Sequence, residues 1–152
     1  MLTDRESINR MIAFRLEANV NTYAAYKNEV PSTRPDSHDY EYTNGPYTYH
    51  DTYVGGTHFA GLETVCLNGK AVYAMNYMGR VLDSRFSGDF LKEALRAAKK
   101  DLPFRGPELY RSGDSTYTCS VTGDITWFTG NETIFLGSEK VYECRFHGGL
   151  TE

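Results

Sequence analysis

The chain has 152 residues, a length typical of a single domain. Hydrophobic residues make up 40% of it and charged residues 24%, which excludes an intrinsically disordered protein. The formal net charge of −4 excludes the broad positive field that attracts a phosphate backbone or an anionic lipid surface. We therefore expect one globular domain over residues 1–152, with no direct nucleic-acid partner and no membrane partner.

The N-terminal residues lack the basic and apolar regions of a signal peptide, and no apolar run approaches the roughly 20 residues that span a bilayer. Cys66, Cys119 and Cys144 are odd in number and have no CxxC spacing, which predicts buried free thiols rather than a disulfide framework. We expect a cytoplasmic protein without a metal or cofactor.

The first predicted element is a helix that runs to about residue 19. Residues 3–6 match a capping box, in which Thr3 and Glu6 would satisfy the free amides at the helix start. Apolar residues then recur at helical spacing on one stripe. Residues 27–38 are rich in proline, serine and threonine and predict a loop.

Four strands are predicted after this loop. Tyrosines alternate through residues 40–53, and Asn44-Gly45 in their middle predicts a hairpin turn. Residues 59–67 and 71–77 predict the third and fourth strands, joined by a turn at Asn68-Gly69. The hairpin should therefore carry a face of tyrosines.

A second helix followed by strands is predicted in the C-terminal half. Ser87 is a typical N-cap, and apolar residues from Leu91 to Ala98 share one helix face ahead of Pro103. Strand patterns and turns follow, at residues 108–111, 117–121, 125–136 and 140–146.

An apparent internal repeat suggests how these elements are arranged. Residues 59–79 align with residues 128–148 without a gap and with 8 identities in 21 positions. Together with the order of elements, this predicts an α+β fold in which a helix followed by about four antiparallel strands is duplicated, over about residues 4–82 and 87–150. The two helices would pack on antiparallel sheets or on a partly open barrel.

Two glutamates at equivalent positions of this alignment are the first candidate ligand-binding residues. Strand alternation places Glu63 and Glu132 on faces that otherwise carry apolar side chains, where a carboxylate is costly unless it is paired or solvated. Solvent-exposed strand ends and aromatic packing are the alternatives for these residues. Aromatic faces beside a carboxylate suit an organic cation. The full set expected to bind a ligand is Glu63, Glu132, Trp127, Tyr73, Tyr77, Tyr142 and His147.

Nearly the whole chain resembles a family of small bacterial proteins of unknown function, which sometimes occurs fused to Xre-type helix-turn-helix regulators. A looser similarity is to GyrI-like effector-binding domains, which implies a glutamate in an aromatic cleft that meets cationic, apolar ligands. The family resemblance implies no activity and no catalytic residues. It is carried by residues 32–42, 53–56, 59–61, 74–79, 104–107 and 146–149.

The leading hypothesis from the sequence is a ligand-binding or effector-sensing module for a small, cationic or aromatic molecule, with no catalysis. A small hydrolase or transferase is the first alternative, in which His147 or His58 and a nearby glutamate act as acid and base. The His38-Asp39 and His50-Asp51 pairs are expected to be solvated surface or loop residues, since neighbours in a strand point to opposite sides. A protein-interaction module with the tyrosine hairpin as its surface is the second alternative. A homodimer is left open.

Overall fold

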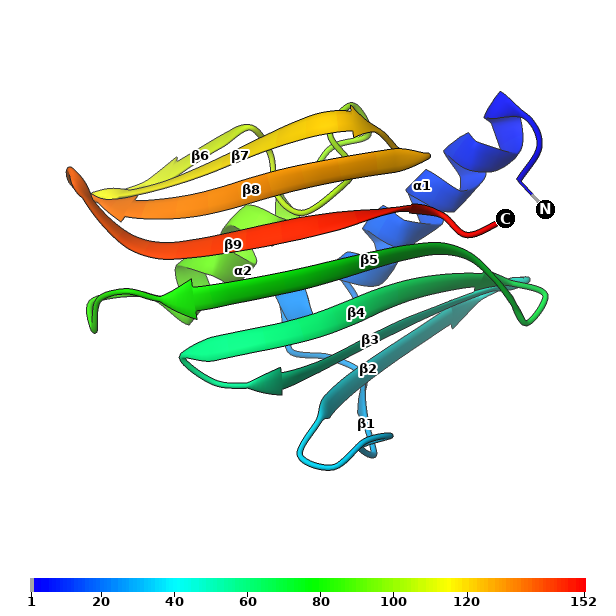
Figure 1. Ribbon diagram of the computed structural model, residues 1–152, viewed down its shortest axis with the longest axis horizontal. Coiled ribbons are helices and arrows are strands. Elements are labelled where there is room, and N and C mark those ends of the chain that lie inside the picture. Colours follow the sequence, from blue (N-terminus) through cyan, green and yellow to red (C-terminus); the bar gives the residue numbers. More distant parts are fainter. Residues whose placement is uncertain (1) are drawn as a thin grey trace.

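The computed structural model describes residues 2–152, in which nine antiparallel strands form one continuous sheet (Figure 1). The strand order is β1-β2-β3-β4-β5-β9-β8-β7-β6, so β5 and β9 lie side by side in the middle. The strands are β1 (Glu29–Val30), β2 (His38–Asn44), β3 (Tyr47–Gly55), β4 (His58–Leu67), β5 (Lys70–Val81), β6 (Leu109–Ser112), β7 (Ser115–Asp124), β8 (Trp127–Leu136) and β9 (Glu139–Leu150).

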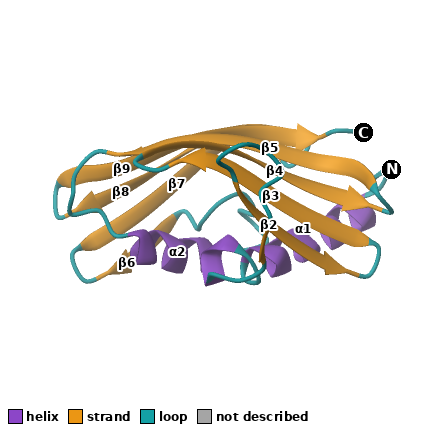
Figure 2. Cartoon of the chain, turned by 90° about the horizontal axis from the view of Figure 1, so that it is seen from below, coloured by secondary structure: helices purple, strands orange, loops and turns teal. Residues whose placement is uncertain are grey.

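Two helices cover one face of this sheet. The sheet arches over α1 (Arg5–Asn19) and α2 (Gly88–Arg96), which lie below its concave face (Figure 2). A short 3₁₀ turn, η1 (Tyr23–Ala25), follows α1 and contacts α2. The core therefore sits in the single layer between the helices and the concave face, because apolar side chains there lose their contact with water.

Strand alternation decides which residues enter this core. On β5, Tyr73, Met75 and Tyr77 are buried, whereas Asn76 and Met78, which alternate with Met75 and Tyr77, are exposed on the opposite face. Within residues 2–152, no helix lies over that opposite face (Figure 2). We call it the open face.

The predicted duplication of a helix and four strands is wrong, and so is the α+β class built on it. The structure is mostly sheet, and β5 pairs directly with β9 from Tyr73↔Leu150 to Val81↔Tyr142. The strands of the two expected units thus belong to one sheet, which is neither two sheets nor a barrel. The first half also holds five strands and a 15-residue helix, against four strands and 9 residues in the second.

Most individual elements agree with the sequence, with corrections at their ends. Ser87 caps α2 as predicted, because its hydroxyl accepts from the Phe90 amide at 3.2 Å. The capping box of α1 uses Asp4 and Ser7 instead of Thr3 and Glu6. The loop predicted over residues 27–38 contains the short strand β1. No helix within residues 2–152 has the length and apolar character needed to cross a membrane.

Candidate functional site

A buried carboxylate on β3 marks the candidate site. Asp51 points to the concave face and is 5% exposed. The Tyr77 hydroxyl, two strands away on β5, donates to its Oδ1 at 2.7 Å. Tyr77 reaches across β4 at Gly61, where a Cβ atom would lie 2.3 Å from the tyrosine ring. Glycine at this position therefore allows the contact between β5 and β3.

Asp51 lines a cavity of about 160 Å³ between the sheet and α2. Exposed Gly55 and Gly56 form one end of its wall, and buried Asp51 and Arg105 line it as well. Aromatic and aliphatic side chains supply most of the remaining wall. They are Tyr23, Tyr53, Phe59, Tyr77, Val81, Phe86 and Leu91.

A second cavity of about 20 Å³ adjoins the first and shares Tyr23, Asp51 and Arg105 with it. This volume is enough for one water-sized group, since a water needs roughly 10–15 Å³. Glu63, which pairs with Asp51 across β3 and β4, also lines it. The two cavities together offer a larger, mainly apolar space beside a small acidic one.

Arg15 of α1 pairs with Glu63. The side chain of Arg15 is fully buried, and its Nη2 donates to Glu63 Oε1 at 2.8 Å. Its Nη1 donates to the carbonyl of Pro103 at 2.6 Å, and Nη2 also donates to that of Phe104. Burial alone would lower the pKa of Arg15, but the charge of Glu63 keeps it above its ordinary value.

Glu132 on β8 forms a second buried pair, with Arg105. The Arg105 guanidinium donates to Oε1 at 2.7 Å and to Oε2 at 3.2 Å. The hydroxyls of Tyr142 and Tyr117 donate to the same two oxygens at 2.7 Å and 2.6 Å. Burial raises the pKa of Glu132, yet Arg105 and these hydrogen bonds bring it below its usual value. This carboxylate is saturated with donors and therefore has no capacity left for a ligand.

Asp51 differs from Glu132 in having few donors. Among the described residues, the hydrogen bond from Tyr77 is the one its carboxyl group receives. Burial, and then the negative charge of Glu63, raise the pKa of Asp51 to about 7. Asp51 is thus a buried acid beside a cavity, poised to exchange its proton near neutral pH.

The structure brings five of the seven predicted ligand-binding residues to the concave face and separates the other two from them. Glu63 lines the smaller cavity and Tyr77 the larger one. Glu132 and Tyr142 are buried and hydrogen-bonded to each other, and Tyr73 is buried under the Arg15 guanidinium. Trp127 and His147 point to the open face, since Phe128 and Phe146 beside them are buried, and Trp127 is 80% exposed.

The residues expected for the two alternative functions lie apart from Glu63 and Glu132 or are packed inward. His58 shares a pocket on the open face with Glu143 instead. His58 and His147 are exposed and alternate with inward-facing Phe59 and Phe146, so neither meets Glu63 or Glu132 on the concave face. The tyrosine face of the hairpin is packed inward, with Phe14 stacked on Tyr42 and Tyr47 and Tyr23 edge-on to Tyr40 and Tyr53. The three cysteines are free.

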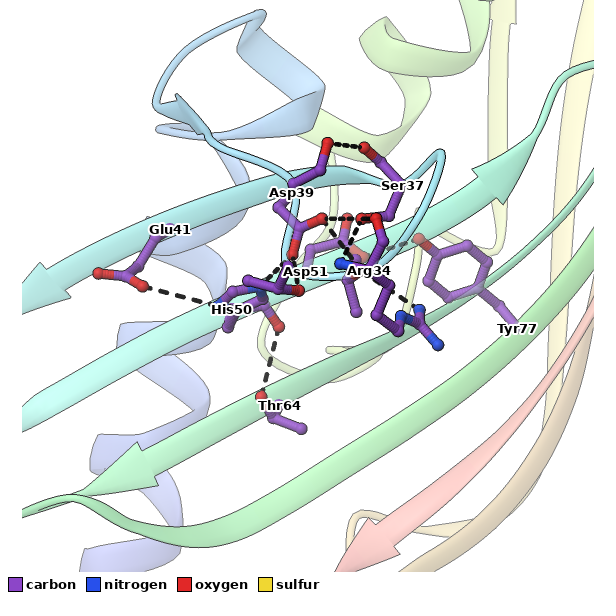
Figure 3. A network of polar contacts seen from close by, with 11 residues as sticks. Arg34, Ser37, Asp39, Glu41, His50, Asp51, Thr64 and Tyr77 are labelled. Carbon is purple, nitrogen blue, oxygen red and sulfur yellow. Dashed lines mark hydrogen bonds and ion pairs between the residues drawn. The ribbon is translucent and has the colours of Figure 1, made fainter.

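The interpretation of the His-Asp pairs as solvated residues is wrong for both aspartates. Figure 3 shows Asp51 with Tyr77 and, on the other side of β3, His50 between Asp39 and Glu41. Asp39 is fully buried under the loop of residues 31–37. Its carboxylate accepts from Ser37 at 2.5 Å, Thr33 at 2.6 Å and His50 at 2.7 Å. Through these hydrogen bonds, Asp39 holds the loop against the open face of the sheet.

Replacing Asp39 by alanine is expected to destabilise the fold by roughly 2–3 kcal/mol, because buried Ser37, together with Thr33 and His50, loses its acceptor. Despite its burial, these donors hold the pKa of Asp39 well below its usual value, so its contribution is present above pH 4 and is lost as the pH falls. Urea denaturation at pH 7 measures the change. Glu41→Ala, at an exposed carboxylate on the same strand, is the control, and an equal loss in both variants would contradict this role.

Sequence reasoning missed the three residues that complete the site, Asp51, Arg15 and Arg105. Asp51 lies in register with the alternating tyrosines at 47, 49 and 53, which could have indicated that it faces inward. Arg15 lies four residues after buried Met11 on the helix stripe. Arg105 lies in the loop before β6, and nothing in its local pattern indicates burial.

The chain is thus a predominantly β protein in which one antiparallel sheet and two helices enclose a cavity with a buried acid. Residues 51–151 match the family described as a domain of unknown function, DUF5680, and the chain belongs to this family. Nothing in that match or in the fold supports the expected links to Xre-type regulators and to GyrI-like domains. Comparison with curated proteins and with solved structures found no match.

Proposed function

We propose that this protein is a binding module for a small molecule with an aromatic or flat apolar body and a polar head group. The observation that carries the proposal is Asp51, a buried carboxyl group with one donor, at the junction of an apolar and an acidic cavity. Burying a polar group costs free energy unless it is hydrogen-bonded, so a ligand that pairs with Asp51 offsets this cost.

The size and lining of the larger cavity limit the ligand. An engineered cavity of similar volume in another protein holds benzene, so about 160 Å³ admits one aromatic ring. Phe59, Tyr53 and Phe86 supply aromatic surface, and Tyr77 and Asp51 supply polar atoms. Few polar groups in an otherwise apolar concavity are typical of small-molecule sites.

A fragment screen with a variant that fills the cavity tests the proposal. Val81 is half-buried in the cavity wall, and Val81→Trp is expected to abolish the binding of single-ring fragments. Saturation-transfer NMR on the intact chain measures binding. Val54→Trp is the matched control, because Val54 is exposed and lies on the open face. Fragments that bind the Val81→Trp variant as well as the unmodified protein, or a screen without any binder, would overturn the proposal.

A further inference from the structure

The buried charged network beside the two cavities carries an unequal number of positive and negative groups. Arg15 and Arg105 are its two cations, and Glu63, Glu132 and Asp51 its three carboxylates, all at least nine-tenths buried. Each arginine is bonded to one glutamate, at 2.8 Å and 2.7 Å. Asp51 is left as the carboxyl group without a cation. The network is therefore neutral while Asp51 is protonated and carries one negative charge once Asp51 ionises.

From this balance, and resting on the proposed function, we infer that the ligand is a monovalent organic cation that binds Asp51 in exchange for its proton. The proton leaves the carboxyl group for solvent as the cation enters, so the buried charge stays at zero before and after binding. No bond other than that to the proton is broken. A neutral ligand would leave the proton in place, and an anion would add uncompensated negative charge to the buried cluster.

The groups around Asp51 agree with such an exchange. Glu63 faces it from β4 and disfavours its ionisation, whereas Arg15 from α1 and Arg105 from the loop before β6 favour it. The remaining neighbours are hydroxyl groups, of which Tyr77 of β5 donates to the carboxyl group. The other tyrosines whose ionisation would be opposed by Asp51 are Tyr23, Tyr40, Tyr49 and Tyr53. These phenols stay neutral near pH 7, because burial and nearby carboxylates raise the pKa of each.

Arg105 also lines the acidic cavity, but its charge is paired with that of Glu132. Its guanidinium binds both oxygens of Glu132 and lies 5.0 Å from the centre of the Tyr77 ring. Its positive charge is therefore compensated locally. The acidic cavity beside it, with Asp51 and Glu63 in its wall, has room for one amino-sized group. An ammonium head, or one amino group of an amidinium, would meet two carboxylates there, while the ring occupies the larger cavity.

Three single-ring probes of matched shape separate this inference from the proposed function. Benzamidinium, benzamide and benzoate carry positive, zero and negative charge on nearly the same frame. Titration calorimetry with the full chain at pH 5.5 and pH 8 is expected to show that benzamidinium binds most tightly of the three. From a pKa of about 7, its affinity should be roughly 30-fold higher at pH 8, with about one proton released per molecule bound at pH 5.5. Proton release is obtained by repeating the titration in buffers of different ionisation enthalpy.

Asp51→Asn provides the second measurement, since its amide oxygen can still accept from Tyr77. This variant should lose the preference for benzamidinium over benzamide and the effect of pH. Two results would overturn the exchange but not the proposed binding function. One is that benzamide or benzoate binds at least as tightly as benzamidinium, and the other is that the affinity for benzamidinium is equal at both pH values. Failure of all three probes to bind at millimolar concentration would overturn both.

Discussion

Replacing Glu132 by leucine is expected to lower the free energy of unfolding by about 3–5 kcal/mol, the typical cost of removing one partner from a buried ion pair. The Arg105 guanidinium would remain buried without its carboxylate, and the hydroxyls of Tyr117 and Tyr142 would lose their acceptor. Leucine has nearly the same size as glutamate, so the loss reports mainly on these polar groups. Urea denaturation followed by circular dichroism measures it.

A control on the next strand separates this effect from the general cost of losing a carboxylate. Glu143 pairs with Arg80 and Lys140 on the open face, where solvent screens the charges. Glu143→Leu should therefore change stability by less than about 1 kcal/mol. Losses of similar size in the two variants would contradict a structural role for the Glu132 network. The double variant Arg105→Met, Glu132→Leu should lose less than the sum of its single changes, because the two residues act as a pair.

The second large effect is a dependence of stability on pH that comes from Asp51. Because its pKa is raised to about 7 from 3.8, the folded state holds this proton more tightly than the unfolded state. The resulting stabilisation is fully present below pH 4 and is lost as the pH rises through 7. Asp51→Asn removes the titration and keeps an acceptor for Tyr77.

We therefore compare the free energies of unfolding of Asp51→Asn and the unmodified protein. Between pH 5 and pH 8, this difference should shift by roughly 2–3 kcal/mol in favour of Asp51→Asn. Urea titrations of both proteins at the two pH values give this difference, in which the other titrating groups cancel. Asp101→Asn, at an exposed aspartate, should show no such change. A difference that stays constant with pH would show that Asp51 is ionised throughout the range.

Local patterns in the sequence predicted the secondary structure well. The tyrosine alternation corresponds to β2 and β3, but the turn between them is shifted by one residue from the prediction, to Gly45-Pro46, where Gly45 adopts φ of +58°. Ser87 similarly starts α2. These features depend on residues that are close in the sequence, so a single sequence is sufficient to predict them.

The arrangement of the strands was not predicted, because it depends on pairing between distant segments. Alternation on β5 and β9 is the same whether they end two separate sheets or meet in one. Only their register, such as Tyr77↔Phe146, shows that the sheet is continuous. The similarity of residues 59–79 and 128–148 was therefore interpreted as a duplicated unit that the structure does not contain.

The site was predicted in part, for a similar reason. Glu63 and Glu132 were found from their place among apolar neighbours, but their arginine partners lie 48 and 27 residues away. Without those partners, the sequence could not distinguish Glu132, which is saturated with donors, from Asp51, which is not. The features that single out Asp51 therefore come from neighbours that are distant in the sequence and close only in the folded structure.

The protonation of Asp51 can be observed directly by carbon-13 NMR of the protein labelled at aspartate carboxyl groups, with the signal assigned by its loss in Asp51→Asn. We predict a titration midpoint near pH 7 for the free protein and a lower midpoint with saturating benzamidinium. A midpoint in the ordinary range of aspartate, near pH 4, that does not move when the probe is added would contradict the account of this cavity as a cation site.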